Sequence, residues 1–315
     1  MKILIMLSIF NFFGTKSGIV EVKDFGPNPG NLTMYQYIPE GLTENAPLVV
    51  VLHGCFQNAD TIAVQSGWNK LADENKFMIV YPQQKLTNNL KSCFSWYQKG
   101  DYERDSGEVA SIKQMIDFAI DQNKLDAERV YITGISAGGA MTSVMMGSYP
   151  EMFEAGSVMA GIPYGAAVDL ASGLTAMKGK TIRTGEEWAE PILKQHPDFK
   201  GEYPRMVLFH GTADSLVSIV NAQEMVKQYK ALHHIDSAPE IIKNFDGNEN
   251  VTLERYVDKN GKDVVDLYSI NMKHGISVSP GEGKKQGGKK AMFAHDTKFH
   301  STYWAAKFFG IVNEE

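Results

Sequence analysis

Short apolar segments alternate with amphipathic segments along most of the chain. Runs rich in β-branched and aromatic residues predict strands, and they lie at 32–38, 46–54, 77–82, 129–134, 155–161, 205–211 and 263–270. The runs LVVVL at 48–52 and MVLF at 206–209 contain no polar residue, which is typical of parallel strands buried on both faces. The pattern therefore predicts an α/β protein with a mostly parallel central sheet flanked by helices.

Helical spacing is clearest in three segments between and after these strands. The segment 107–123 places apolar residues on one stripe, and 222–232 repeats that spacing. The segment 301–310 predicts an apolar helix that docks on the sheet, and the pair Asn260–Gly261 predicts a hairpin turn. The least patterned stretch, 166–203, predicts an insertion over one end of the sheet, in which Trp188, Ile192 and Leu193 could line a lid or an adsorbing face.

Length and composition are those of a globular protein with a large core. The chain has 315 residues, of which 43% are hydrophobic, and no shift of composition marks a domain boundary. Met1, Lys2 and the apolar run 3–13 predict a signal peptide at 1–17, followed by one catalytic domain at 18–315. The run is too short to span a bilayer, so we expect a secreted or periplasmic protein with no stable membrane insertion. An ordinary buried N-terminal segment is the alternative.

Charge argues against nucleic acid as a partner. The formal net charge is −6, and the one basic cluster, GKKQGGKK at 283–290, is spaced by glycines as in a solvated loop. The sequence leaves the oligomeric state open.

The segment YITGISAGGAM at 131–141 carries the strongest chemical signal. Gly134, Ser136 and Gly138 form a G-x-S-x-G pattern between a predicted strand and a predicted helix. Glycines on both sides allow a cramped turn that lifts the serine hydroxyl above the sheet and points a helix N-terminus toward it. The pattern predicts a nucleophile, and a plain tight turn is the alternative.

A serine nucleophile needs a base and an acid to orient that base. Asp214 follows the strand ending in HG, and His274 follows the strand at 263–270. The order serine, aspartate, histidine is the one that α/β hydrolases use. The residues weighed against them are His295 and His300 as the base, and Asp236 and Asp246 as the acid.

Two further histidines, His53 and His210, are predicted to be structural. His53 and His210 each precede a glycine at a strand end, where they would hold the following loop. His233 and His234 are adjacent and have no third ligand at a suitable spacing, so we expect no metal and no cofactor. The oxyanion would need two backbone donors, which we predict at Ala137, after the nucleophile, and at Cys55, in the loop HGCFQ.

The two cysteines, Cys55 and Cys93, suit an exported protein with one disulfide, while two free buried thiols are the alternative. A disulfide would tie the loop HGCFQ to the aromatic segment CFSWYQ. In that segment Phe94, Trp96 and Tyr97 are candidates for the apolar wall of the substrate pocket, with a role as core aromatics equally open.

These segments together resemble the esterase family that includes polyhydroxybutyrate depolymerases and related feruloyl and acetylxylan esterases. The likeness runs through VLHGCFQNAD, CFSWYQKGD, SGEVASI, VYITGISAGGAM, HGTAD, KHGISVSPG and STYWAAKFFG, which covers most of the chain from about residue 47. The resemblance implies an α/β-hydrolase fold, ester hydrolysis, the triad Ser136, Asp214 and His274, and an oxyanion site at Cys55 and Ala137.

We therefore predict a serine carboxylesterase that hydrolyses short-chain esters or hydroxyalkanoate oligomers through an acyl-enzyme. A feruloyl or acetylxylan esterase is the alternative within enzymes, and an inactive binding module is the alternative outside them. No stretch is left over for a polymer-adsorbing module, so we expect soluble esters to be preferred over crystalline polymer.

Overall fold

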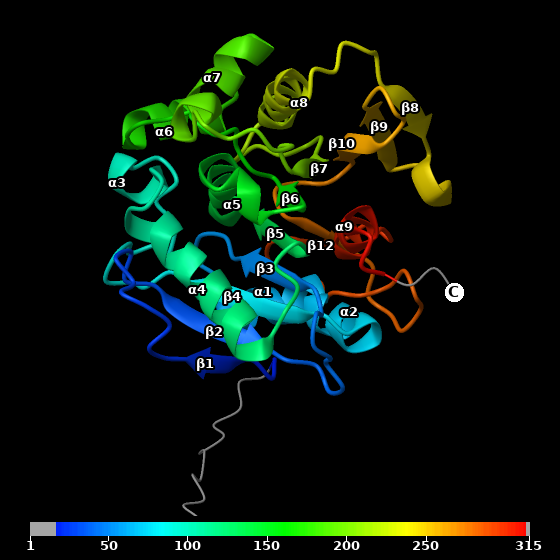
Figure 1. Ribbon diagram of the computed structural model, residues 1–315. Helices are drawn as coiled ribbons and strands as arrows, with labels where there is room; N and C mark the ends of the chain where they lie inside the picture. Colours follow the sequence, from blue (N-terminus) through cyan, green and yellow to red (C-terminus); the bar gives the residue numbers. More distant parts are fainter. Residues whose placement is uncertain (1–16, 313–315) are drawn as a thin grey trace, which may run out of the picture.

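A ten-stranded mixed sheet forms the centre of the protein (Figure 1). The computed structural model describes residues 17–312, so the predicted signal peptide, apart from Ser17, lies outside the described residues. The strand order is β1-β2-β4-β3-β5-β6-β7-β10-β9-β8. The six strands from β4 to β10 in that order run parallel, and they are β4 (Met78–Gln83), β3 (Leu48–Leu52), β5 (Val130–Ile135), β6 (Ala155–Met159), β7 (Arg205–Gly211) and β10 (Asp263–Ile270).

Antiparallel strands extend this parallel centre on both sides. One side has β2 (Thr33–Tyr37) and β1 (Val20–Val22), and the other has β9 (Val251–Val257) and β8 (Glu240–Lys243). The strands β9 and β10 are joined by the turn predicted at Asn260–Gly261, where Gly261 has φ 81°. A separate two-stranded sheet pairs β11 (Ile276–Val278) with β12 (Ala294–Asp296). The mostly parallel sheet predicted from the sequence is confirmed.

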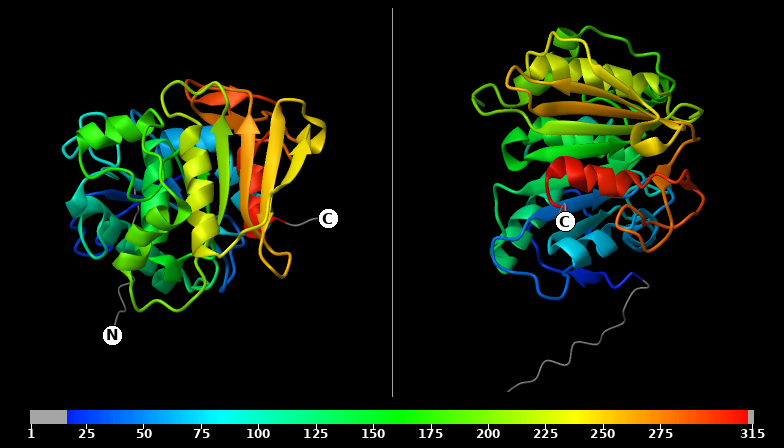
Figure 2. Two further views of the ribbon diagram at one scale, coloured as in Figure 1. Left: turned by 90° about the horizontal axis from the view of Figure 1, so that it is seen from above. Right: turned by 90° about the vertical axis from the view of Figure 1, so that its right-hand side faces the viewer.

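Helices cover both faces of the sheet, as the views of Figure 2 show. Alternate residues of β3 face opposite ways, so that Val50 packs in one apolar cluster and Val51 in the other. The first cluster includes α4 (Gly107–Asn123), α5 (Ala137–Ser148), α7 (Gly185–Gln195) and α8 (Val220–Leu232). The second includes α1 (Ala59–Ser66), α2 (Trp68–Asn75) and α9 (Ser301–Phe309). The shorter elements are α3 (Lys99–Tyr102), α6 (Leu170–Met177) and the 3-10 turns Pro150–Met152 and Phe245–Gly247.

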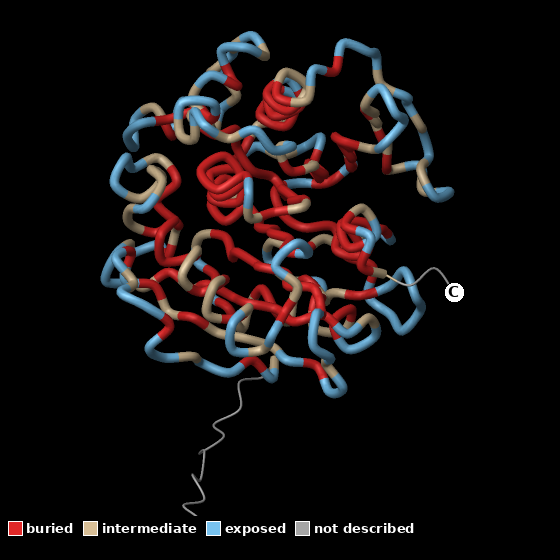
Figure 3. The backbone as a smooth tube through the Cα atoms, viewed as in Figure 1, coloured by how far each residue is buried: buried red, intermediate tan, exposed pale blue. Residues whose placement is uncertain are grey.

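The burial pattern agrees with the sequence periodicity. Strand β3 and helix α5 are buried along their whole length, while the peripheral loops are exposed (Figure 3). The helix expected at 107–123 forms with those bounds, and its apolar stripe faces the core.

Two of the three residues predicted to line a lid or an adsorbing face in the segment 166–203 lie in the core instead. Trp188 and Ile192 lie on α7, which packs against α8, and both side chains are fully buried. The Trp188 indole Nε1 donates a hydrogen bond to Glu224 Oε2 at 2.6 Å. The prediction that Trp188 and Ile192 line a lid is therefore wrong, because the apolar face of α7 is taken up by the core. Leu193 is exposed.

Candidate active site

Ser136 lies at the sharp turn between β5 and α5. Its backbone has φ 57° and ψ −118°, a left-handed φ that a non-glycine residue adopts only under constraint. A Cβ atom at Gly134 would come within 2.3 Å of the Gly138 carbonyl oxygen, and one at Gly138 within 2.4 Å of the His53 carbonyl oxygen. The turn therefore requires glycine at both positions of the G-x-S-x-G pattern.

Asp214 and His274 follow two neighbouring parallel strands, β7 and β10. The carboxyl ends of parallel strands meet at one edge of the sheet, which brings these two side chains together although they are distant in sequence. The His274 Nδ1 atom lies 2.6 Å from Asp214 Oδ2. Asp214 Oδ1 also accepts hydrogen bonds from the N–H groups of Leu216 and Val217, both at 2.9 Å.

The Asp214 carboxylate is held in its ionised form. Burial by itself would raise its pKa, but the hydrogen bond from His274 and the backbone donor of Val217 outweigh burial and keep the pKa below its ordinary value. His210 Nε2 lies 3.6 Å from Asp214 Oδ2 and donates a hydrogen bond to the Val217 carbonyl oxygen at 2.9 Å. Burial lowers the pKa of His210, so this ring is neutral and holds the loop, as predicted.

Ser136 and His274 open onto the same cavity. The cavity has a volume of about 640 Å³. Its walls are mostly apolar and include Trp96, Tyr97, Leu170, Leu174, Met177, Leu216 and Phe293. Of the predicted wall residues, Trp96 and Tyr97 thus line it.

Phe94 does not line this cavity, which corrects the prediction for that residue. Its side chain is completely buried and packs on His53, with ring centroids 4.9 Å apart. Phe94 is the core aromatic that the sequence left open. Leu170, Leu174 and Met177 carry no specific signal in the sequence, because they lie in the least patterned stretch of the chain, 166–203.

The loop after β3 lies beside Ser136. A Cβ atom at Gly54 would be 3.5 Å from Ser136 Cβ. Three backbone amides of this loop have acceptors. The Gly54 N–H donates to Gln57 Oε1, the Phe56 N–H donates to the Lys91 carbonyl oxygen, and the Gln57 N–H donates to the Gly54 carbonyl oxygen. Within residues 17–312, by contrast, no protein acceptor is hydrogen bonded to the N–H of Cys55 or of Ala137.

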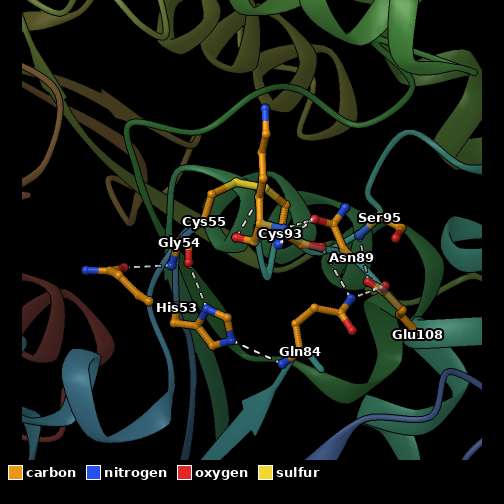
Figure 4. The surroundings of a disulfide bond; sticks show 10 residues. His53, Gly54, Cys55, Gln84, Asn89, Cys93, Ser95 and Glu108 are labelled. Atoms are coloured by element: carbon orange, nitrogen blue, oxygen red, sulfur yellow. Dashed lines mark hydrogen bonds between the residues drawn. A yellow bond between two sulfur atoms is a disulfide. The ribbon is translucent and has the colours of Figure 1, made fainter. Parts of the chain in front are cut away.

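The predicted disulfide between Cys55 and Cys93 is confirmed (Figure 4). It joins the loop after β3 to the segment 84–98, and both cysteines line the cavity. The segment 84–98 also contributes Asn88, Asn89, Leu90 and Lys91 to the cavity wall.

Apolar side chains surround the mouth of the cavity without being buried. Leu90 is 89% exposed and Phe56 is 71% exposed. Leu170, Leu174 and Leu216, which also line the cavity, are about half exposed. We call these five residues, Phe56, Leu90, Leu170, Leu174 and Leu216, the apolar rim.

Three of the four residues weighed against the predicted base and acid, His295, His300 and Asp246, have other partners. His295 Nε2 donates to the backbone carbonyl of His274 at 2.9 Å, and the buried His300 donates to Ser66 O at 2.8 Å. Asp246 pairs with Lys285. Neither histidine lines the cavity.

In the part of the chain that the structure describes, no three or more His, Cys, Asp or Glu side chains are grouped as metal ligands. No helix among these residues is long and apolar enough to cross a membrane.

A serine at a glycine-flanked strand-to-helix turn, beside an aspartate–histidine pair at the carboxyl edge of a mostly parallel sheet, defines an α/β hydrolase. The acetyl xylan esterase from Aspergillus awamori has this fold, with a TM-score of 0.78 and 24% identity over 93% of this chain and 99% of that chain.

Residues 32–251 match the sequence model of the family described as esterase PHB depolymerase, and the chain belongs to that family. It is 38% identical to poly(3-hydroxyalkanoate) depolymerase C of Paucimonas lemoignei, over 93% of this chain and 70% of the relative. It is 31% identical to feruloyl esterase B of Talaromyces funiculosus, over 76% of this chain and 67% of the relative. The protein is therefore an esterase, a hydrolase of carboxylic ester bonds.

Proposed function

We propose that the protein is a serine carboxylesterase that works through an acyl-enzyme on Ser136. The Ser136 hydroxyl attacks the ester carbonyl carbon while His274 Nε2 accepts the hydroxyl proton, and Asp214 orients the imidazole and stabilises its charged form. The tetrahedral intermediate collapses as the alcohol leaves with the proton from His274. A water molecule, deprotonated by His274, then releases the carboxylic acid and restores Ser136. This sequence of steps requires no cofactor.

One observation carries this proposal. Ser136 and His274 line one cavity, and Nδ1 of His274 is hydrogen bonded to the buried, ionised side chain of Asp214, which leaves Nε2 available. The N–H groups of Cys55 and Ala137 supply donors for the oxyanion. The helix N-terminus leaves its first amides free, and in the loop after β3 the amides on both sides of Cys55, those of Gly54 and Phe56, are already hydrogen bonded.

The cavity supports an ester with an apolar acyl or alcohol part. Its volume of about 640 Å³ and its aromatic and aliphatic walls suit a short chain or a hydroxyalkanoate oligomer, since each polar group placed there without a partner would be costly. The name of the Paucimonas relative supports the hydroxyalkanoate reading. Export of the protein, with the signal peptide at 1–17 and the catalytic domain at 18–315, remains part of this proposal.

The experiment compares wild type with Ser136→Ala on a panel of soluble esters. We expect wild type to hydrolyse p-nitrophenyl butyrate and the hydroxybutyrate trimer, and Ser136→Ala to lose roughly three to six orders of magnitude in kcat with an unchanged melting temperature. Methyl ferulate and acetylated xylose in the same panel test the alternative substrates. An inactive wild type would favour the binding module, and an active, folded Ser136→Ala would refute the proposed mechanism.

A further inference from the structure

The side chain of His53 is completely buried behind the loop that carries Cys55. His53 directly follows β3, and its ring makes two hydrogen bonds to the backbone (Figure 4). Nδ1 lies 2.8 Å from the Gly54 carbonyl oxygen, and Nε2 lies 3.1 Å from the Gln84 nitrogen. The ring is not part of the cavity wall, so it does not touch a bound ester.

The two contacts determine which nitrogen carries the proton. Burial lowers the pKa of His53 to about 4, although the contact with Gly54 opposes this, so the ring is neutral and holds one proton at neutral pH. The backbone amide of Gln84 can only donate, so Nε2 must accept from it. The proton therefore lies on Nδ1, which donates it to the Gly54 carbonyl oxygen.

The Gly54 carbonyl and the Cys55 N–H belong to one planar peptide unit. No cis peptide bond occurs among the described residues, and in a trans unit the C=O and N–H groups point in opposite directions. A hydrogen bond that holds the carbonyl on the His53 side therefore turns the Cys55 N–H away from the buried ring. Cys55 and Ser136 both line the cavity, whereas His53 does not. The preceding amide, that of Gly54, is held by Gln57 Oε1 at 2.8 Å.

Gln84, the partner of His53 Nε2, is itself fixed by the first turn of α4. The Gln84 side chain donates from Nε2 to Glu108 Oε1 at 2.5 Å, and Glu108 Oε2 accepts from the Ser95 N–H at 2.8 Å. Gln84 and Glu108 are almost completely buried. Phe94 packs on the other side of the His53 ring. The imidazole is thus confined by α4, the segment 84–98 and β3.

We propose that His53 is a positioning residue that orients the Gly54–Cys55 peptide as an oxyanion donor. This inference rests on the proposed function, since it needs an oxyanion beside Ser136. Through the Nδ1–H bond, His53 holds the Cys55 N–H in place before the transition state forms, so that no reorganisation is needed when negative charge develops.

Two substitutions separate the roles of the two ring nitrogens. In His53→Asn the amide nitrogen takes the place of Nδ1 and can still donate to Gly54. In His53→Gln the amide reaches the place of Nε2, so the Gly54 carbonyl loses the donor from residue 53 and keeps the longer bond from the Gln57 N–H at 3.2 Å. We expect His53→Gln to lower kcat by roughly tenfold to a hundredfold with KM nearly unchanged, because the contact matters mainly in the transition state. His53→Asn should retain most of the kcat.

His300 provides a matched control. Like His53 it is buried, burial lowers its pKa to about 4, and one ring nitrogen, here Nε2, bonds a backbone carbonyl. That carbonyl belongs to Ser66, which does not line the cavity, and not to the Gly54–Cys55 peptide. We expect His300→Gln to lower the melting temperature without lowering kcat. The effect of His53→Gln should be the same for p-nitrophenyl acetate and butyrate, since every ester presents the same carbonyl oxygen, whereas a displaced pocket wall would affect the two differently.

Three results would overturn the proposal. The first is a kcat of His53→Gln equal to that of His300→Gln, and the second is an equal loss of kcat in His53→Asn and His53→Gln. The third is failure of both His53 variants to fold. In each of these cases an inactive Ser136→Ala leaves the proposed function standing. An active Ser136→Ala would instead refute the proposed function itself.

Discussion

His274 Nδ1 lies 2.6 Å from Asp214 Oδ2, although 60 residues separate the two positions in the chain. The contact exists because β7 and β10 are adjacent parallel strands and each side chain follows the carboxyl end of its strand. It leaves the other ring nitrogen of His274 for the cavity that Ser136 also lines.

This relationship predicts different results for the two histidines of the segment 274–295. His274→Ala should lower kcat by roughly three to six orders of magnitude, as expected when one member of a catalytic triad is removed. His295→Ala should retain kcat within about tenfold, because His295 donates only to the backbone carbonyl of His274. Steady-state hydrolysis of p-nitrophenyl butyrate measures both, and the reverse order of activities would show that the wrong base was chosen.

The strand pattern and the G-x-S-x-G spacing were sufficient to predict the sheet, the turn at Ser136 and the positions of Asp214 and His274. They were sufficient because uninterrupted apolar runs and glycine spacing are local signals. The sequence could not show which aromatic residue of CFSWYQ lies in the core and which line the cavity, because nothing in the local pattern distinguishes Phe94 from Trp96. The tertiary fold determines that Phe94 packs on His53. The same limit applies to Trp188, whose burial depends on the packing of α7 against α8.

The buried Glu108 should make the stability of the protein fall as the pH rises. Burial and the nearby Asp101 raise its pKa from 4.5 to about 8. Between these values the folded state keeps a proton that the unfolded state has released, so the free energy of unfolding should decrease by roughly 1.4 kcal/mol per pH unit and level off above the folded pKa. Urea unfolding of wild type between pH 5 and pH 9 measures this slope.

Glu108→Gln removes the titrating group and should flatten that dependence. The exposed Glu40→Gln should keep the slope of wild type and serves as the control. An equal slope in Glu108→Gln and wild type would show that another group is responsible.

Reduction of the Cys55–Cys93 disulfide should lower both stability and activity. The bond closes a loop with a sequence separation of 38 residues, which on the chain-entropy model stabilises the folded state by about 4 kcal/mol. Activity should fall as well, because Cys55 carries one proposed oxyanion donor and Cys93 belongs to the cavity wall. The measurement compares melting curves and kcat of the wild type with and without a phosphine reductant. The double variant Cys55→Ser/Cys93→Ser is measured in the same way. Unchanged values under full reduction would contradict this role.

The apolar rim bears on the preference between soluble and insoluble substrates. The preference for soluble esters stays a prediction. Binding to a solid polymer requires either a separate adsorbing module or an exposed apolar face, and the apolar rim provides such a face at the cavity. We expect Leu170→Ser/Leu174→Ser to release less acid from dispersed crystalline polyhydroxybutyrate, with a smaller loss on the soluble trimer.

Leu193→Ser is the matched control for the rim variant, since Leu193 is also an exposed leucine on a neighbouring helix but does not line the cavity. It should act like wild type on both substrates. Equal losses on polymer and trimer in the rim variant would mean that Leu170 and Leu174 contribute only to the cavity.

The nucleophile itself can be identified by peptide mapping after reaction with a fluorophosphonate, which bonds covalently to an activated serine. The account predicts one phosphonyl group per protein, located on Ser136, and no adduct in the folded variant Ser136→Ala or, at the same exposure time, in His274→Ala. An adduct on another residue, or an active protein that remains unlabelled, would contradict the assignment of Ser136 as the catalytic nucleophile.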